Sequence, residues 1–295
     1  MDPRNLPANW PYRSAAQMVR VERIDWWVVD TGPRDAPALL LLHGLGASGH
    51  SFRRTIPGLA KHYRLIVPDL PGHGCTRTKD RDRLGLSPIA EDLCWLCDAM
   101  GVQPGAVIGH SAGGAIALQM ALNTSIPRVV GINAALDHFE GVTGVLFPLI
   151  ARGLAAFPLT APVAARLWAS PARVSQLLDS TGSVIDAAGK AQYTTLVQDT
   201  EHVAGALDMM AQWRLDPLIL NLPRLRKPAL LLAGKGDKAV PPAVSESAAH
   251  AMPQVELRMM EGGHLLHEVA PDGLSALLAD WLAGHGLGTP PATRA

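Results

Sequence analysis

The stretch AVIGHSAGG, residues 106–114, places one serine among small residues directly after an apolar run. Such a run is typical of a strand buried on both faces of a parallel sheet. The segment that follows, AGGAIALQMALN, reads as a helix. We therefore predict a strand, a sharp turn that lifts Ser111 clear of the sheet, and an immediate helix. Gly109 and Gly113 fit this turn because close neighbouring backbone would leave no room for a Cβ atom.

Further apolar runs alternate with helix-like segments on both sides of this turn. A bent antiparallel pair is expected over 17–32, and an alternation of strands and helices predicts a parallel sheet with helices on both faces. We thus predict an α/β fold with a mostly parallel sheet of eight strands. The other expected strands lie at 37–44, 63–74, 105–111, 127–136, 227–237 and 255–264, and the expected helices at 51–62, 86–101, 112–123, 241–252 and 271–286.

The middle of the chain interrupts the alternation. Residues 136–213 contain helix-like pieces but no convincing buried strand, and they lie between two strands of the predicted sheet. We interpret them as a helical cap inserted into a core made of residues 1–135 and 214–285. The polar end of the sequence, 286–295, is expected to be a disordered tail.

The pattern G-x-S-x-G at 109–113 predicts a nucleophilic serine. A serine hydroxyl needs a base, and in this strand–turn–helix context the acid and then the histidine follow the serine along the chain. His264 and Asp237 each follow a predicted strand, at the sheet edge where doubly wound folds gather their chemistry. Asp137 is the competing acid because it follows the preceding strand. We favour Asp237, whose glycine-rich strand end suits an orienting loop.

Two backbone N–H groups are expected to stabilise an oxyanion. One belongs to Ala112, directly after the nucleophile, and the other to Leu45 in the loop HGLGAS, 43–48. We expect His43 to brace this loop, and we place both His43 and His110 among the residues that line the pocket. Asp69, in the loop DLPGHG, is expected to fix that loop rather than to react.

Together HGLGAS, DLPGHGCT, GHSAGG, GKGDKAVPP and EGGHLLHE resemble the α/β-hydrolase fold superfamily over residues 37–282. The cap segments GINAALDHFEG, LFPLIARGLA, LLDSTGSVIDAAGKAQY and HVAGALDMMAQW, with LPRL and the initial NWPYRSAAQMVRV, resemble one branch. That branch contains the magnesium-chelatase-associated hydrolase-like accessory proteins of bacteriochlorophyll biosynthesis. The resemblance implies a role beside magnesium insertion into protoporphyrin, with magnesium chelatase subunits as partners.

The predicted cap is unusually apolar and suggests a hydrophobic ligand. Most of its large side chains should form the cap's own core, and a minority should line the pocket. Methionines suit an adaptable wall, and tryptophan suits a flat ring such as a porphyrin or porphyrin ester. The cap residues expected in the pocket are Phe147, Trp168, Met209, Met210 and Trp213.

Composition excludes several other classes of function. The 26 basic and 26 acidic residues balance, so nothing indicates a nucleic-acid partner. Charged and proline residues interrupt every apolar stretch before it reaches the ~20 residues that span a bilayer. We expect a cytoplasmic protein with at most peripheral membrane contact. The histidines are dispersed, so we expect no metal site and no cofactor.

The sequence leaves three functions open. The first is a serine hydrolase that transfers the acyl group of a hydrophobic ester to water. The second is a non-catalytic tetrapyrrole-binding or chelatase-accessory protein that retains the fold. The third is a cofactor-free perhydrolase or C–C bond hydrolase, because these enzymes share the same triad.

Overall fold

The computed structural model describes residues 1–137 and 170–288. Its sheet has the strand order β1-β2-β4-β3-β6-β7-β8-β9, and the two-residue strand β5 pairs with β2. The pairings from β4 to β9 are parallel, and those of β1 with β2 and of β2 with β4 are antiparallel. The predicted fold class is therefore confirmed, with β5 as an addition. The strands are β1 Ala16–Val21, β2 Ile24–Thr31, β3 Ala38–Leu42, β4 Arg64–Pro68, β5 Arg77–Thr78, β6 Pro104–His110, β7 Val129–Ile132, β8 Ala229–Gly234 and β9 Val255–Met260.

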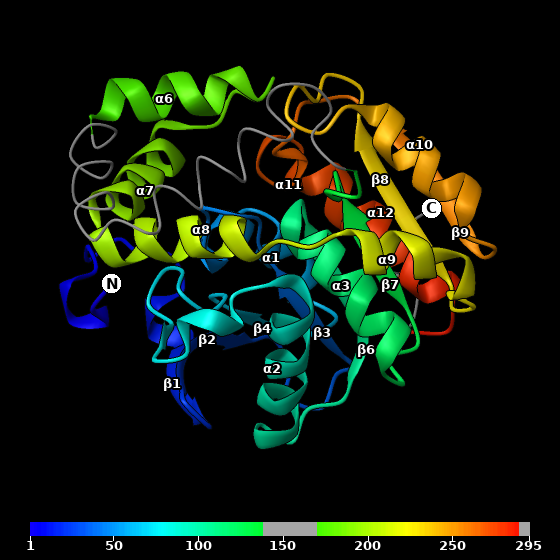
Figure 1. The fold of residues 1–295 in the computed structure, drawn as a ribbon, viewed down its shortest axis with the longest axis horizontal. Coiled ribbons are helices and arrows are strands. Elements are labelled where there is room, and N and C mark those ends of the chain that lie inside the picture. The colour runs from blue at the N-terminus through cyan, green and yellow to red at the C-terminus, as the bar shows by residue number, and fades with distance from the viewer. Residues whose placement is uncertain (138–169, 289–295) are drawn as a thin grey trace.

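Helices cover both faces of the sheet (Figure 1). Successive side chains of a strand point to opposite faces. In β3, accordingly, Leu40 and Leu42 pack with α2, α3 and α10, while Leu39 and Leu41 pack with α1 and α12. The core helices are α1 Ile56–Leu59, α2 Leu86–Ala99, α3 Ala112–Asn123, α9 Asp216–Asn221, α10 Pro242–Ala251, α11 Leu266–Val269 and α12 Pro271–Gly284. Short 3₁₀ turns are η1 Pro3–Asn5, η2 Arg13–Ala15, η3 Gly49–Phe52, η4 Arg81–Arg83 and η5 Leu222–Arg224.

The helix predicted over 51–62 is shorter than expected. The segment forms the 3₁₀ turn η3 and then the single turn α1. Pro57 cannot donate a helical hydrogen bond, and Gly58 is a weak helix former. Gly58 also packs directly on α12, because a Cβ atom there would lie 2.6 Å from the side chain of Ser275.

Four α-helices of the described residues lie between β7 and β8, and the first three of them form the described part of the cap. They are α6 Pro171–Ser180, α7 Ala187–Gln198 and α8 Thr200–Gln212, and they lie together beside the sheet in Figure 1. Ser170, Asp186 and Asp199 cap their N-termini by accepting backbone N–H bonds. Residues 138–169 of the predicted cap lie outside the described residues.

The C-terminal segment corrects the predicted tail, which was placed from residue 286 onward. Leu287 is buried in the cluster beneath α12, and the Tyr63 hydroxyl donates to its carbonyl at 3.1 Å. Residues 289–295 lie outside the described residues. No helix within 1–137 or 170–288 is long and apolar enough to cross a bilayer.

Candidate active site

Ser111 occupies a strained turn between β6 and α3. Its backbone angles are φ 53° and ψ −117°, in a region that costs a non-glycine residue about 1–3 kcal/mol. A Cβ atom on Gly109 would lie 2.0 Å from the Gly113 carbonyl oxygen, and one on Gly113 would lie 2.3 Å from the Leu42 carbonyl oxygen. Both glycines are therefore needed for the strand and the helix to meet at Ser111.

His264 and Asp237 come together at the carboxyl ends of β9 and β8. The His264 Nδ1 lies 2.8 Å from the Asp237 Oδ2. The other carboxylate oxygen accepts the N–H groups of Ala239 and Val240, each at 2.8 Å, which fixes the carboxylate plane. The competing acid Asp137 is solvent-exposed, whereas Asp237 is buried against the imidazole.

The Ser111 and His264 side chains line the same cavity. The hydrogen bonds of the described residues include the one from His264 to Asp237 but none from the Ser111 Oγ to the His264 ring. The geometry thus supplies the acid–base pair directly, and Ser111 lies in the wall of the same cavity. The last link of the triad belongs to the proposal below.

His43 orients the loop that carries Leu45. Its Nε2 accepts the Leu70 N–H at 2.8 Å, so the neutral ring carries its proton on Nδ1, which lies 2.8 Å from the Gly44 carbonyl oxygen. Burial holds the His43 pKa well below its usual value and keeps the ring neutral. The Gly44 C=O and the Leu45 N–H belong to one planar peptide, so this bond also fixes the direction of the N–H. His43 itself is fully buried, and its predicted place in the pocket wall is wrong.

The two predicted oxyanion donors belong to the loop after β3 and to the first residue of α3. Ala112 is the first residue of α3, so its N–H has no acceptor within the helix. Leu45 lines the cavity and is 39% exposed. Behind this loop, Asp69 accepts the N–H groups of Gly49 at 2.8 Å and Cys75 at 2.7 Å, as expected of a residue that fixes loops.

The cavity has a volume of about 480 Å³, within the range of small-molecule sites. Its described lining contains no lysine, arginine, aspartate or glutamate. The wall consists mainly of aliphatic side chains, together with Met210, Tyr193, three histidines and the hydroxyl residues Ser111 and Thr181. The lining residues are Gly44, Leu45, Gly46, Ala47, His110, Ser111, Val174, Leu177, Leu178, Thr181, Tyr193, Val197, His202, Val203, Ala206, Leu207, Met210, His264 and Leu265.

The predicted cap residues divide between the cavity and the core. Met210 lines the cavity on the same face of α8 as Val203, Ala206 and Leu207. Met209 is rotated away from that face and is fully buried in the main core, so its predicted place in the wall is wrong.

Trp213 also departs from the prediction. It follows the end of α8 and packs against the main core instead of lining the cavity. Phe147 and Trp168 lie outside the described residues.

His110 lines the cavity as predicted but also holds the base. Its Nε2 lies 2.9 Å from the His264 carbonyl oxygen. His267 is fully buried, and its ring packs against that of His110 in a tilted arrangement with ring centroids 4.2 Å apart. Burial lowers the pKa of His267 to about 3. Both rings are thus neutral supports beneath the base.

Asn133 is a positioning residue that the sequence analysis missed. Its Nδ2 donates to the His264 carbonyl at 2.7 Å and to the Gly263 carbonyl at 3.1 Å, while its Oδ1 accepts the Gly234 N–H at 2.7 Å. It therefore ties the ends of three adjacent strands together, with its own backbone at φ 45°. A polar residue directly after the buried run VVGI was the available signal.

Comparisons with known proteins agree with this geometry. The family model described as alpha/beta hydrolase fold matches residues 37–271. A magnesium-chelatase 30 kDa subunit from Rhodobacter capsulatus is 68% identical over 96% of this chain and 100% of that protein. A pimeloyl-(acyl-carrier protein) methyl ester esterase from Xanthomonas oryzae pv. oryzae is 31% identical over 77% of this chain and 88% of that protein.

Solved structures show the same fold. A loop variant of a haloalkane dehalogenase from Bradyrhizobium elkanii superposes with a TM-score of 0.72 at 21% identity, covering 91% of this chain and 96% of that one. The family match over residues 37–271 and the 68% identity to the magnesium-chelatase subunit show the family of the chain. The chain belongs to the α/β-hydrolase fold family and is a homologue of the magnesium-chelatase 30 kDa subunit.

Proposed function

We propose that the chain is a serine hydrolase that cleaves a carboxylic ester of a hydrophobic substrate. The observation that carries this proposal is the Asp237–His264 hydrogen bond at the rim of a cavity that Ser111 also lines. The methyl ester esterase among the relatives supports the choice of an ester. Ser111, His264 and Asp237 are the proposed nucleophile, base and orienting acid.

The proposed reaction has two acyl-transfer steps. Ser111 Oγ attacks the acyl carbon and gives its proton to Nε2 of His264, while Asp237 stabilises the imidazolium through Nδ1. The N–H groups of Leu45 and Ala112 stabilise the oxyanion, and collapse of the intermediate expels the alcohol, which takes the proton from His264. Water then attacks the acyl-serine while His264 takes its proton. The bond between the acyl carbon and Oγ breaks, His264 returns the proton to Ser111, and the carboxylic acid leaves.

The side chains that line the cavity restrict the class of substrate that can bind there. Because no charged side chain appears in the described lining, an ionised carboxylate would be buried there without a partner, which is costly. The part of the substrate inside the cavity is therefore neutral and apolar in this proposal. A porphyrin ester would satisfy this condition only if its free carboxylates stay outside the cavity.

A serine-directed fluorophosphonate probe tests the proposal. Wild-type protein at pH 7.5 should be labelled on the peptide that contains Ser111, Ser111→Ala should not be labelled, and His264→Ala should lose labelling. An unlabelled wild type that folds normally would contradict a hydrolase.

A second function is supported by the name of the most identical relative described above, a magnesium-chelatase subunit. In this alternative the protein binds a tetrapyrrole or the chelatase and supports bacteriochlorophyll synthesis without catalysis. Ser111→Ala decides between the two in a phototrophic strain that lacks its own copy. Full restoration of pigment favours the accessory role, and failure to restore pigment by a stable, folded variant favours catalysis.

A further inference from the structure

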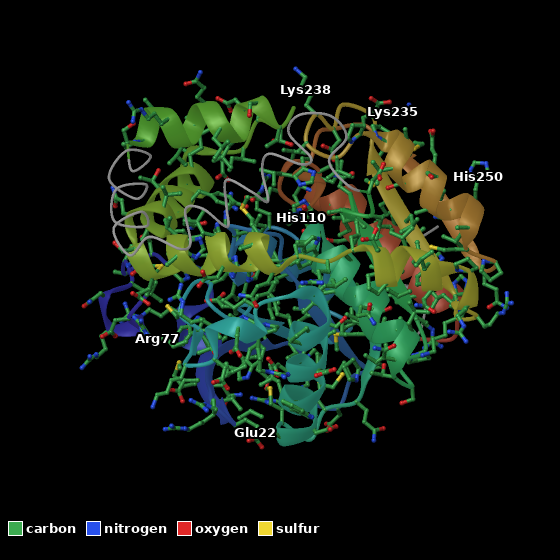
Figure 2. All side chains as sticks on the ribbon, in the orientation of Figure 1. Glu22, Arg77, His110, Lys235, Lys238 and His250 are labelled. Carbon is green, nitrogen blue, oxygen red and sulfur yellow. The ribbon has the colours of Figure 1, made fainter. Side chains whose placement is uncertain are left out.

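The cap contacts the proposed base through its backbone. The His264 N–H donates to the Thr181 carbonyl at 3.2 Å, and the Leu265 N–H donates to the Ser183 Oγ at 2.8 Å. The Thr181 carbonyl also accepts the Lys238 N–H at 3.2 Å, next to Asp237. Lys238 is labelled in Figure 2 on the loop after β8, where its side chain points outward. One cap segment, 181–183, therefore bonds the loops of both the acid and the base.

Glycines allow this contact to be a direct backbone contact. Gly182 has φ +82°, and a Cβ atom on it would lie 2.1 Å from the Gly236 carbonyl oxygen. A Cβ atom on Gly263 would lie 2.2 Å from the Gly182 carbonyl oxygen. Each of the three segments thus contributes a glycine at the place where they meet, so the spacing between cap and core is tightly defined here.

A second contact ties the cap to the helix that follows the base. The Tyr193 hydroxyl donates to Glu268 Oε1 at 2.8 Å, and Glu268 is fully buried in α11, which begins two residues after His264. Arg53 forms an ion pair with Glu268 and a second one at 2.7 Å with Asp186 at the start of α7. The base segment, 262–268, is therefore attached to the cap at both ends.

The cap also contacts the loop of the proposed oxyanion donor. His202 of α8 accepts the Gly74 N–H on Nδ1 at 3.0 Å, and its Nε2 lies 3.1 Å from the Gly46 carbonyl oxygen. Burial holds the His202 pKa well below its usual value, so the neutral ring can accept on one nitrogen and donate from the other.

From these contacts we propose that the 181–183 segment of the cap, chiefly Ser183 and the Thr181 carbonyl, positions the catalytic base. In the core, Asp237 bonds the His264 ring, and Asn133 and His110 bond its carbonyl oxygen. The cap bonds its backbone N–H. The same cap helices line the cavity, with Leu178 one turn before the segment and Tyr193 after it. Occupation of the cavity and alignment of His264 are therefore coupled. This inference rests on the proposed hydrolase function.

Ser183→Ala tests the inference, with Ser180→Ala as the matched control. Ser183 is buried and accepts from the base segment, whereas the Ser180 hydroxyl is exposed and donates to Leu177 of its own helix. The rate of Ser111 labelling at saturating fluorophosphonate and the probe's half-saturation concentration are measured separately. Small displacements of catalytic groups can cost up to ~10²-fold in rate. We expect Ser183→Ala to lower the saturating rate about tenfold at unchanged half-saturation, and Ser180→Ala to stay within twofold of wild type.

Amide hydrogen exchange of residues 262–266 provides the second measurement. Exchange should be at least tenfold faster in Ser183→Ala than in Ser180→Ala, because the Leu265 N–H loses its acceptor. Unchanged exchange, or faster exchange with an unchanged labelling rate, would overturn the positioning role. If wild type is not labelled at all, the hydrolase proposal fails, and exchange alone then decides whether the cap holds the base segment.

Discussion

Ser111 is held by its own turn and by one neighbouring strand, whereas His264 is held by residues from four other segments. The elbow joins β6 to α3 through two glycines, and the Ser111 backbone bonds the Ile132 carbonyl and the Ala135 N–H, each at 3.0 Å. The base is bonded by Asp237, Asn133, His110 and the cap segment 181–183. Substitutions at the elbow should therefore disturb folding near Ser111. Substitutions far from His264 in the sequence should still disturb the position of its side chain.

Among the residues that bond His264, loss of the Asp237 carboxylate should have the largest effect on the reaction rate. In Asp237→Asn the amide can still accept the Ala239 and Val240 N–H groups, but it can present its NH₂ to the imidazole and favour the wrong tautomer. We expect about 10⁴-fold slower ester hydrolysis and labelling of Ser111. Asp137→Asn is the control and should remain within twofold of wild type. Similar losses in the two variants would contradict the assignment of the acid.

Low pH should lower the stability of the fold, because several buried histidines near the site are neutral in the folded protein. Burial lowers the pKa of His73 to about 4 and of His267 to about 3, and it holds the pKa values of His43, His50, His110 and His202 well below the usual value. The unfolded chain binds these protons below pH ~6.5, whereas the folded chain does not. Stability therefore falls as pH decreases from about 6.5 toward the folded pKa values, by about 1 kcal/mol per ring over the first unit.

Some carboxyl groups act in the opposite direction. Burial raises the pKa of Asp69 to about 6 and also raises the pKa of Glu268 and Asp92, so protonation of these groups favours the folded state as pH falls. The six rings outnumber them, and we expect the free energy of unfolding in urea to be several kcal/mol lower at pH 5.5 than at pH 7.5. In His267→Phe, unfolding at low pH should take up about one proton fewer than in wild type, so stability should depend less steeply on pH. Equal stability at the two pH values would refute the expectation.

The smallest expected effects concern two adjacent methionines of α8, which differ in their surroundings. Met209 is fully buried in the main core, while Met210 lines the cavity. Met209→Ala should lower the free energy of unfolding by about 2–5 kcal/mol. Met210→Ala should cost less than about 1 kcal/mol and raise the KM for long-chain p-nitrophenyl esters a few-fold. Equal destabilisation by the two substitutions would show that α8 does not separate core from cavity in this way.

The elbow at Ser111 and the contacts that hold His264 also differ in how well the sequence predicts them. The sheet and the elbow follow from buried apolar runs and from glycines beside Ser111, and these signals are local. Met209 could have been assigned to the core, because 203, 206, 207 and 210 share one helical face. The roles of Ser183 and His202 could not be predicted, since their partners are 82 and 128 residues away and are backbone groups.

The most direct test of the account is to trap the acyl-enzyme. Wild-type protein is mixed with p-nitrophenyl butyrate, quenched in acid within one turnover, and digested for mass spectrometry. The account predicts a butyryl group on the peptide that contains Ser111, and no such adduct in His264→Ala. A wild type that hydrolyses the ester while Ser111 stays unmodified, or that carries the acyl group on another residue, would contradict it.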